Sequence, residues 1–180
     1  IDYGVACFSY SGDPVLAQQL KDKYGTEYPK LGEMFVAWIR TMDERITHDV
    51  AWFDALGTLY EYIASRSKKS WLGQFFTPET VCDLMTMVTT GPEKRVGEKV
   101  DDPACGSGRL LLSFNAHHPG NRLYGEDLDP ICAKMTALNM AIHGCQGQAT
   151  CMDSLCQNWK FCYEVNPYHS MGMPPIPHLV

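Results

Sequence analysis

The amino-acid sequence predicts an α/β fold, in which a partial parallel sheet is flanked by helices and preceded by an N-terminal helical segment. In the first 70 residues, apolar residues recur at helical spacing. From residue 77 onward, helical patterns alternate with short strand patterns, which is typical of βαβ units. A glycine-rich turn follows the first of these strands. We therefore expect a helical segment over residues 1–70 and an α/β domain over residues 71–180.

Capping signals and apolar spacing place the helices of the N-terminal segment. An Asp-Pro start and a glycine stop predict a short helix over residues 14–24. Apolar residues three or four positions apart predict a longer helix over residues 31–46. Asp49 is expected to cap another helix, whose apolar residues run from 50 to 63, and residues 66–70 form a polar linker.

In the α/β domain, Thr77 is expected to cap a helix that begins at Pro78 and that Gly91 ends. Helices are also predicted over 109–116 and 130–143, and strands over 96–101, 122–127, 148–152 and 160–165. This alternation implies parallel strands joined by right-handed crossovers. The tail from Asn166 contains four prolines and is not expected to form regular structure.

The composition limits the partners and the location of the protein. The chain has 180 residues, 45% of them hydrophobic, and a formal net charge of −6. It can form a core, but its acidic balance is not typical of a protein that grips DNA phosphates by itself, so DNA contact should need an additional domain or subunit, or a local basic patch that the composition does not reveal. No apolar stretch approaches the ~20 residues of a membrane span, and the first residues show no signal-peptide pattern. We expect no membrane association and a cytoplasmic location.

The eight cysteines include no Cys-x-x-Cys pair, and several fall within apolar periodic segments. We therefore expect buried thiols in a reducing compartment rather than disulfides. Cys151, Cys156 and Cys162 lie close together in the sequence, but no metal site is predicted from them.

The turn Asp102-Pro103-Ala104-Cys-Gly106-Ser-Gly108 predicts a ligand site at the end of the first strand. Its glycines permit a tight turn and a close backbone approach, and the amides that begin the next helix face the ligand. About 20 residues after the turn, Asp127 closes the second strand, where a carboxylate can bind both ribose hydroxyls. The pattern points to an adenosine-containing cofactor.

Other acidic residues near these strands leave alternatives open. Glu126 and Asp129 compete with Asp127 for the ribose, although Asp129 is more typical of a helix start. Asp153 closes the third strand and, together with Ser154, could cap a short turn or accept a proton from an adenine amino group.

Two segments resemble the modification subunit of type I restriction-modification systems, within the adenine-N6 DNA methyltransferases. They are Gly73-Gln-Phe-Phe-Thr-Pro78 and the turn Asp102–Gly108, which stand in the order found in that family. A Rossmann dehydrogenase would instead show Gly-x-Gly-x-x-Gly. The resemblance implies a Rossmann-like S-adenosylmethionine-dependent methyltransferase fold, with S-adenosylmethionine as cofactor.

The resemblance also implies a role for each matching residue. The first segment would border the methionine moiety, the turn would lie beside it, and the second and third strands would hold the ribose and the adenine. The cofactor-binding residues would be Phe75, Thr77, Pro78, Asp102, Pro103, Ala104, Gly106, Gly108, Asp127, Leu128, Asp153 and Ser154, with Ile131 and Leu155 flanking the adenine ring.

The catalytic tetrapeptide of the family, Asn/Asp-Pro-Pro-Tyr/Phe, has no intact match. Its polar side chain and first proline carbonyl orient the target amino group, and its aromatic ring stacks on the flipped base. The nearest candidate is Asn166-Pro167-Tyr168, which has one proline fewer. Asn166 is therefore a candidate catalytic residue or a turn residue that ends a strand.

The sequence leaves three functions open. The first is an S-adenosylmethionine-binding domain related to adenine-N6 DNA methyltransferases. The second is a catalytically inactive module that acts through a partner, and the third is methylation of a protein glutamine. Because the family has further strands after Asn166, we also expect a truncated member, a fragment, or a reduced protein that another chain completes. A partner protein or a second copy would then cover an exposed sheet edge.

Overall fold

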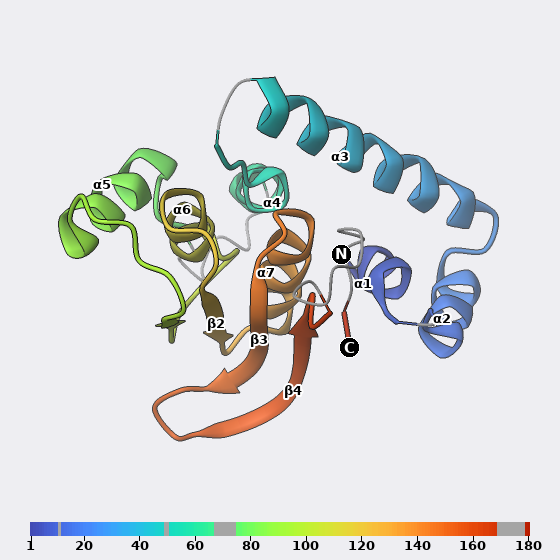
Figure 1. Cartoon of the computed structure of the whole chain (residues 1–180). Coiled ribbons are helices and arrows are strands. Elements are labelled where there is room, and N and C mark those ends of the chain that lie inside the picture. Colours follow the sequence, from blue (N-terminus) through green and yellow to red (C-terminus); the bar gives the residue numbers. More distant parts are fainter. Residues whose placement is uncertain (11, 49–50, 67–74, 169–178) are drawn as a thin grey trace.

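The computed structural model describes residues 1–10, 12–48, 51–66, 75–168 and 179–180. Four strands form one sheet in the order β1-β2-β3-β4 (Figure 1). Their bounds are β1 Lys99–Asp102, β2 Arg122–Asp127, β3 Gln146–Asp153 and β4 Asn158–Val165. The first three strands are parallel, and β4 is antiparallel to β3. The predicted α/β class is therefore confirmed, with a mostly parallel sheet.

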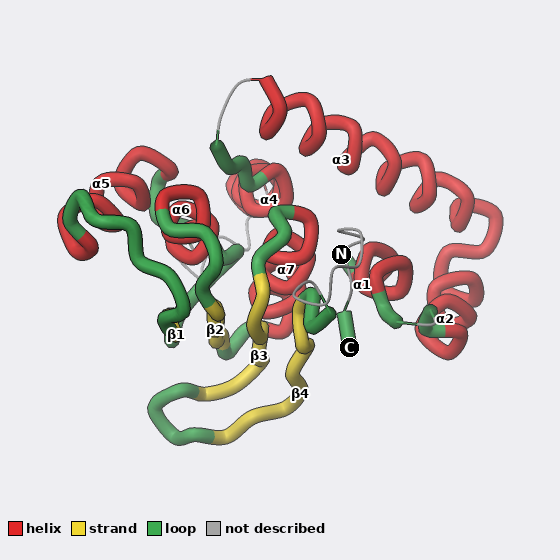
Figure 2. Tube along the Cα trace, in the orientation of Figure 1, coloured by secondary structure: helices red, strands yellow, loops and turns green. Residues whose placement is uncertain are grey.

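The parallel arrangement implied for the fourth strand is wrong. β3 and β4 form a hairpin that extends beyond the other strands (Figure 2). The connection runs from 154 to 157, which is too short for a parallel crossover of a dozen or more residues. Gln157 supports the tight connection with a φ of 54°. As a result, β4 runs back toward the end of the sheet at which the three parallel strands begin.

Two helices cover the sheet. α6 (Arg109–His117) packs on β1 and β2, and α7 (Pro130–Ile142) packs on β2, β3 and β4. Both connect neighbouring parallel strands with right-handed crossovers and so lie on one face of the sheet (Figure 1). α5 (Glu79–Thr90) packs on α6.

The N-terminal helices pack on the outer side of α7. They are α1 (Asp2–Phe8), α2 (Pro14–Tyr24), the 3-10 turn η1 (Gly25–Glu27), α3 (Tyr28–His48) and α4 (Ala55–Arg66). α1 and α4 contact α7, and the long helix α3 packs over both of them (Figure 1). α7 is covered by the sheet on one side and by these helices on the other, which is why most of its residues are buried whatever their direction.

Several predicted boundaries match and others shift. The helix over Pro14–Tyr24 and the strand over Arg122–Asp127 have the predicted bounds. β1 starts at Lys99, later than predicted, because the turn before it gives Gly97 a φ of 78°. α1 was not predicted as a separate helix.

Two predicted helix caps are wrong. α4 is capped by Asp54, whose carboxylate accepts the Gly57 amide at 2.7 Å, whereas Asp49 lies outside the described residues. α5 begins after Pro78, which is the N-cap residue with an extended ψ of 144°, so Thr77 does not cap it. In both cases more than one polar residue precedes the apolar pattern, and spacing alone does not distinguish them.

The C-terminal residues return to the sheet. Leu179 forms isolated bridges with Val165 at the end of β4 and with Ser9 after α1. The Val180 amide donates to the Glu164 carbonyl at 3.0 Å. These contacts cover one end of the outer edge of β4, which was predicted to be exposed. The proline-rich stretch at 169–178 lies outside the described residues.

Within the described ranges, no helix is long and apolar enough to cross a membrane. All eight cysteines are free thiols, of which five are buried and Cys7, Cys156 and Cys162 are exposed. The prediction of buried thiols therefore describes five of the eight, since the remaining three lie on helix and hairpin surfaces.

Candidate functional site

The glycine turn is built by bonds to itself and to β2. The Gly108 amide donates to the Cys105 carbonyl at 2.8 Å, and the Cys105 amide donates to the Glu126 carbonyl at 2.8 Å. The φ angles of Gly106 and Gly108 are 58° and 88°, which residues with a Cβ rarely adopt. The turn therefore lies at the carboxyl edge of β1 and β2, as its sequence predicted.

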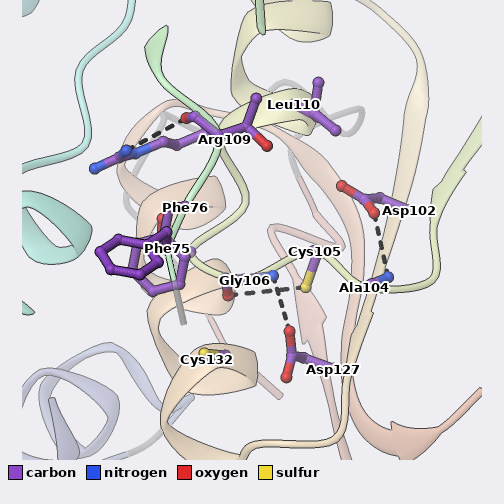
Figure 3. A pocket seen from close by; sticks show the side chains of 12 residues that line it. Phe75, Phe76, Asp102, Ala104, Cys105, Gly106, Arg109, Leu110, Asp127 and Cys132 are labelled. Atoms are coloured by element: carbon purple, nitrogen blue, oxygen red, sulfur yellow. Dashed lines mark hydrogen bonds between the residues drawn. The ribbon is translucent and has the colours of Figure 1, made fainter. Parts of the chain in front are cut away.

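Asp127 faces this turn. Its Oδ2 accepts the Gly106 amide at 2.9 Å (Figure 3). Its Oδ1 accepts the Asp129 amide at 2.8 Å. A carboxylate has about four acceptor sites, so two remain for ligand hydroxyls. Asp129 instead caps α7 by accepting the Ile131 amide at 2.8 Å, which is the helix-start role predicted as its alternative.

A pocket of about 180 Å³ lies between the turn and the segment that precedes α5. Its lining comes from that segment, from the turn and α6, and from β2 and α7 (Figure 3). The lining residues are Phe75, Phe76, Thr77, Asp102, Ala104, Cys105, Gly106, Ser107, Arg109, Leu110, Asp127 and Cys132. Because pockets for drug-sized ligands measure about 300–1,000 Å³, this cavity would hold one portion of an adenosine-type cofactor rather than all of it.

The front wall of the pocket is the pocket loop, which we define as residues 75–78. The Phe76 ring lies against the turn, since a Cβ on Gly106 would come within 2.7 Å of its Cδ1 atom. The centre of the Phe76 ring is also 5.7 Å from the centre of the Tyr60 ring of α4. Phe75 is 85% exposed, at the mouth of the pocket. The first family-like segment and the glycine turn therefore meet, although residues 73 and 74 lie outside the described residues.

Asp54, which the sequence analysis did not single out, lies buried behind the turn. It has no exposed surface, and its Oδ2 accepts the Ser107 hydroxyl at 2.5 Å and the Arg109 Nε at 2.7 Å. Its Oδ1 accepts the Asn139 Nδ2 at 2.8 Å as well as the α4 cap bond. One carboxylate thus joins α4, the glycine turn, α6 and α7.

Arg109 extends this connection to the pocket loop. Its Nη2 donates to Glu61 Oε2 at 3.0 Å, and its Nη1 donates to the Thr77 carbonyl at 3.3 Å. Burial lowers the pKa of the Arg109 guanidinium, but Asp54 and Glu61 outweigh burial and raise it, so Arg109 stays charged. A buried cation held by two carboxylates is fixed in one orientation.

The pocket has an acidic character. Asp102 and Asp127 line it, and the one cation among its lining residues, Arg109, is already paired with Asp54 and Glu61. Burial raises the pKa of Asp102; the Ala104 amide, 3.2 Å from its Oδ1, opposes this, and Asp101 and Asp127 add to it. The surplus of carboxylates favours a ligand that carries positive charge.

The two lining cysteines are not set up as nucleophiles. Burial raises the pKa of both the Cys105 and the Cys132 thiols well above the usual range. Cys105 Sγ lies 3.3 Å from the Thr136 hydroxyl, within hydrogen-bond distance. A protonated thiol is a weak nucleophile and a poor metal ligand. In the described ranges, no group of three His, Cys, Asp or Glu side chains could hold a metal ion.

Six of the predicted cofactor-binding residues line the pocket, and six do not. Those in the lining are Phe75, Thr77, Asp102, Ala104, Gly106 and Asp127. Pro78, Pro103 and Gly108 are immediate neighbours of that lining, and the Pro103 carbonyl accepts the Ser154 hydroxyl at 2.9 Å. Leu128, beside Asp127, is 59% exposed.

Asp153 takes the turn role that the sequence analysis left open. Its Oδ1 accepts the amides of Leu155 and Cys156 at 3.1 and 3.0 Å in the hairpin connection. The amide of Cys156 chiefly lowers the pKa of this carboxyl. Leu155 and Ile131, predicted to flank an adenine ring, are 97% and 43% exposed. Their adenine contacts stay a prediction.

The structure does not bring Asn166-Pro167-Tyr168 to the pocket. Asn166 is 2% exposed, and its Nδ2 donates to the Ala141 carbonyl at 3.0 Å and to the Cys145 carbonyl at 2.8 Å. It follows Val165, which pairs with Gly147 near the start of β3. Asp127 lies five positions along β2 from Arg122, the partner of Gln146, so the two sites are separated by about 16 Å along the strand direction alone, at about 3.3 Å per residue.

The family model described as N-6 DNA Methylase matches residues 52–166. The methylase subunit of the type I restriction enzyme HindI from Haemophilus influenzae is 36% identical over 103 residues, 51% of this chain and 22% of that protein. The type I restriction enzyme MjaIX methylase subunit from Methanocaldococcus jannaschii is 32% identical over 111 residues, 56% of this chain and 19% of that protein.

A solved structure is also similar. It is the methyltransferase subunit of a type I restriction-modification system from Streptococcus thermophilus, with 32% identity and a TM-score of 0.39 over 51% of this chain and 21% of that chain. The matched part of the chain thus spans about a fifth of the length of these relatives.

The family match is extensive and includes the pocket. It starts at Trp52, immediately before the α4 cap, and runs through the pocket loop, the glycine turn and Asp127. The match therefore begins earlier than the domain boundary expected at residue 70, which stays a prediction. Since it covers more than half of the 180 residues and contains every residue that lines the pocket, the chain belongs to the N-6 DNA methylase family.

Proposed function

We propose that this chain is the S-adenosylmethionine-binding part of an adenine-N6 DNA methyltransferase of a restriction-modification system. The observation that carries the proposal is the bond between the Gly106 amide and the Asp127 carboxylate, at the carboxyl edge of two parallel strands. In α/β sheets of this kind, nucleotide-type ligands bind at that edge. Membership of the N-6 DNA methylase family supports the same ligand.

The lining residues fit the chemistry of this ligand. Asp127 has acceptor sites left for ribose hydroxyls, and the glycine turn lets the ligand approach the backbone closely. The acidic lining suits a cofactor that carries a sulfonium and an ammonium group. When bound, S-adenosylmethionine supplies an electrophilic methyl group, so the protein chiefly has to bind and orient its reactants.

We propose that methyl transfer to DNA adenine requires protein beyond this chain. The formal net charge is −6, and the Asn166 side chain is hydrogen-bonded at a position that lies about 16 Å from Asp127 along the strand direction. The relatives are named as methylase subunits of restriction enzymes, and the matched segment covers only about a fifth of their length. DNA contact, the catalytic polar residue and the cover for the sheet edges would come from further segments, a partner subunit or a second copy. The cytoplasmic location stays a prediction.

The placement of Asn166 also favours a second candidate function, a binding module without catalysis. In that case the pocket would bind S-adenosylmethionine and the protein would act through a partner. The two functions differ in one assay. Transfer of a tritiated methyl group to adenine-containing DNA, in the presence of the rest of the methylase, is expected only for the first.

Isothermal titration calorimetry with S-adenosylmethionine tests the pocket itself. We expect Asp127→Asn to weaken binding about 10- to 100-fold, because hydrogen bonds to a charged group contribute about 1.5–3 kcal/mol. Asp101→Asn is the matched control, since Asp101 is exposed on the neighbouring strand outside the pocket lining. No binding to the wild-type chain, or equal binding by both variants, would contradict the proposal.

A further inference from the structure

We infer that Glu61 is a positioning residue, which acts together with Arg109 to hold the pocket loop against the glycine turn. Glu61 lies on α4, in the N-terminal part of the chain, and does not line the pocket. We call the Glu61–Arg109 ion pair, together with its bonds to Phe76 and Thr77, the clamp. The identity of the ligand in this pocket rests on the proposed function, whereas the clamp is a property of the ligand-free protein.

Glu61 holds the pocket loop through both of its carboxylate oxygens. Its Oε1 accepts the Phe76 amide at 2.9 Å, and its Oε2 accepts the Arg109 Nη2 at 3.0 Å. Arg109 in turn donates to the Thr77 carbonyl at 3.3 Å. Two consecutive residues of the loop are thus bound, one by its amide and the other by its carbonyl, to one ion pair.

Arg109 connects this ion pair to the opposite wall of the pocket. It begins α6 directly after the glycine turn, and it is 6% exposed. Its Nε donates to the fully buried Asp54, and its guanidinium lies 5.5 Å from the centre of the Phe76 ring. Because Asp54 fixes one side of the guanidinium, its remaining donors point at Glu61 and Thr77. The clamp therefore joins the two walls between which the ligand would bind.

Holding the pocket loop in place should lower the entropy cost of ligand binding. The described residues of the pocket loop lie in no helix or strand, so backbone ladders do not fix them. Phe76 reaches the turn at Gly106 only while the loop stays in this position. A wall that is already ordered costs less entropy when a ligand binds, so the clamp should preorganise the pocket.

Hydrogen–deuterium exchange of the ligand-free protein tests the clamp. We expect Glu61→Ala to speed exchange of the Phe76 amide at least about 10-fold, because that amide loses its acceptor. Glu61→Gln keeps an acceptor for the amide but loses the charge that faces Arg109, so exchange should be intermediate. Glu98→Gln removes a surface pairing with Arg95 far from the pocket, and it should leave the loop unchanged.

The outcomes distinguish a local effect on the pocket loop from a general loss of stability, and they test the clamp independently of the proposed ligand. Faster exchange at Phe76, with α6 and α7 amides unchanged, supports the clamp. Unchanged exchange at Phe76 in Glu61→Ala, or an equal increase throughout α6 and α7, overturns it. Calorimetry should also show about 10-fold weaker S-adenosylmethionine binding by Glu61→Ala. If the wild-type chain binds none, the proposed function fails, while the exchange result still decides the clamp.

Discussion

Similar polar residues lie at the two ends of the parallel strands, but they make different contacts. At the carboxyl edge, Asp127 and the glycine turn meet the pocket loop, and acceptor sites remain available around a cavity. At the opposite end of the strands, Asn166 is buried and donates its amide hydrogens to a carbonyl in the last turn of α7 and to a carbonyl between α7 and β3. The difference shows that a polar residue in a segment similar to a family motif can contribute to the pocket only if the topology carries it there.

Asp54 lies behind the pocket, where its carboxylate accepts four hydrogen bonds. We expect Asp54→Ala to destabilise the fold by about 3–5 kcal/mol, because it leaves the buried Arg109 without its main partner. Urea unfolding of the variant measures this loss. Asp43→Ala, on the exposed surface of α3, serves as control and should change stability by less than about 0.5 kcal/mol. Equal stability of the two variants would contradict the role of Asp54.

At the opposite end of the strands, substitution of Asn166 should lower the stability of the fold without changing its affinity for S-adenosylmethionine. We expect Asn166→Ala to cost about 2–3 kcal/mol, since two buried carbonyls lose their donor. Its affinity for S-adenosylmethionine should equal that of the wild type. Denaturation together with calorimetry on the same sample measures both quantities. A stable variant that had lost the cofactor would place Asn166 in the site.

Gly57 tests how closely α4 approaches the turn. A Cβ at this position would overlap Asp54 Oδ2 and lie 2.5 Å from Ser107 Oγ. We therefore expect Gly57→Ala to destabilise the protein by about 1–2 kcal/mol, although alanine normally stabilises a helix relative to glycine. Gly32→Ala on α3, where the nearest atom is the Tyr3 hydroxyl at 3.2 Å, should instead be stabilising. Thermal denaturation of both variants decides between these signs.

The smallest expected effect concerns pH. Burial lowers the pKa of His143 below its ordinary value of 6.5, despite the opposing effects of the Asn139 carbonyl and of Asp54. The neutral ring accepts the Phe53 amide at 3.2 Å, directly before the α4 cap. Since the unfolded chain takes up the proton first, stability should fall as the pH drops below about 6.5, by at most about 1.4 kcal/mol per pH unit. His143→Gln should remove this part of the pH dependence in unfolding titrations; an unchanged slope would refute it.

Local signals were sufficient for the glycine turn and its acidic partner. Asp102–Gly108 and Asp127 lie on neighbouring strands, so strand order and spacing alone predict that they meet. Caps and apolar periodicity likewise placed α2 and β2. In each case the relevant contacts are close in sequence or follow from one crossover.

Contacts between distant segments were not predictable in this way. Asp54 and Ser107 are far apart in the chain, and the signal at Asp54, an acidic residue ahead of a helical pattern, describes a cap equally well. The direction of β4 depended on the length of its connection to β3, which the strand pattern did not show. The residues of the Asn166 segment left a catalytic role and a turn role open. The hairpin carries the segment to the opposite end of the strands, where Asn166 directly follows β4 in the turn role.

Photolabelling with S-adenosylmethionine tests the central claim most directly. Ultraviolet irradiation of the bound, tritiated cofactor, followed by peptide mapping, reports which residues it contacts. We predict label in the peptides that contain the pocket loop or residues 102–110, and its loss in Asp127→Asn. Label in the peptide that contains Asn166 and Tyr168, or specific labelling that Asp127→Asn does not reduce, would contradict a cofactor pocket at the carboxyl edge of the sheet.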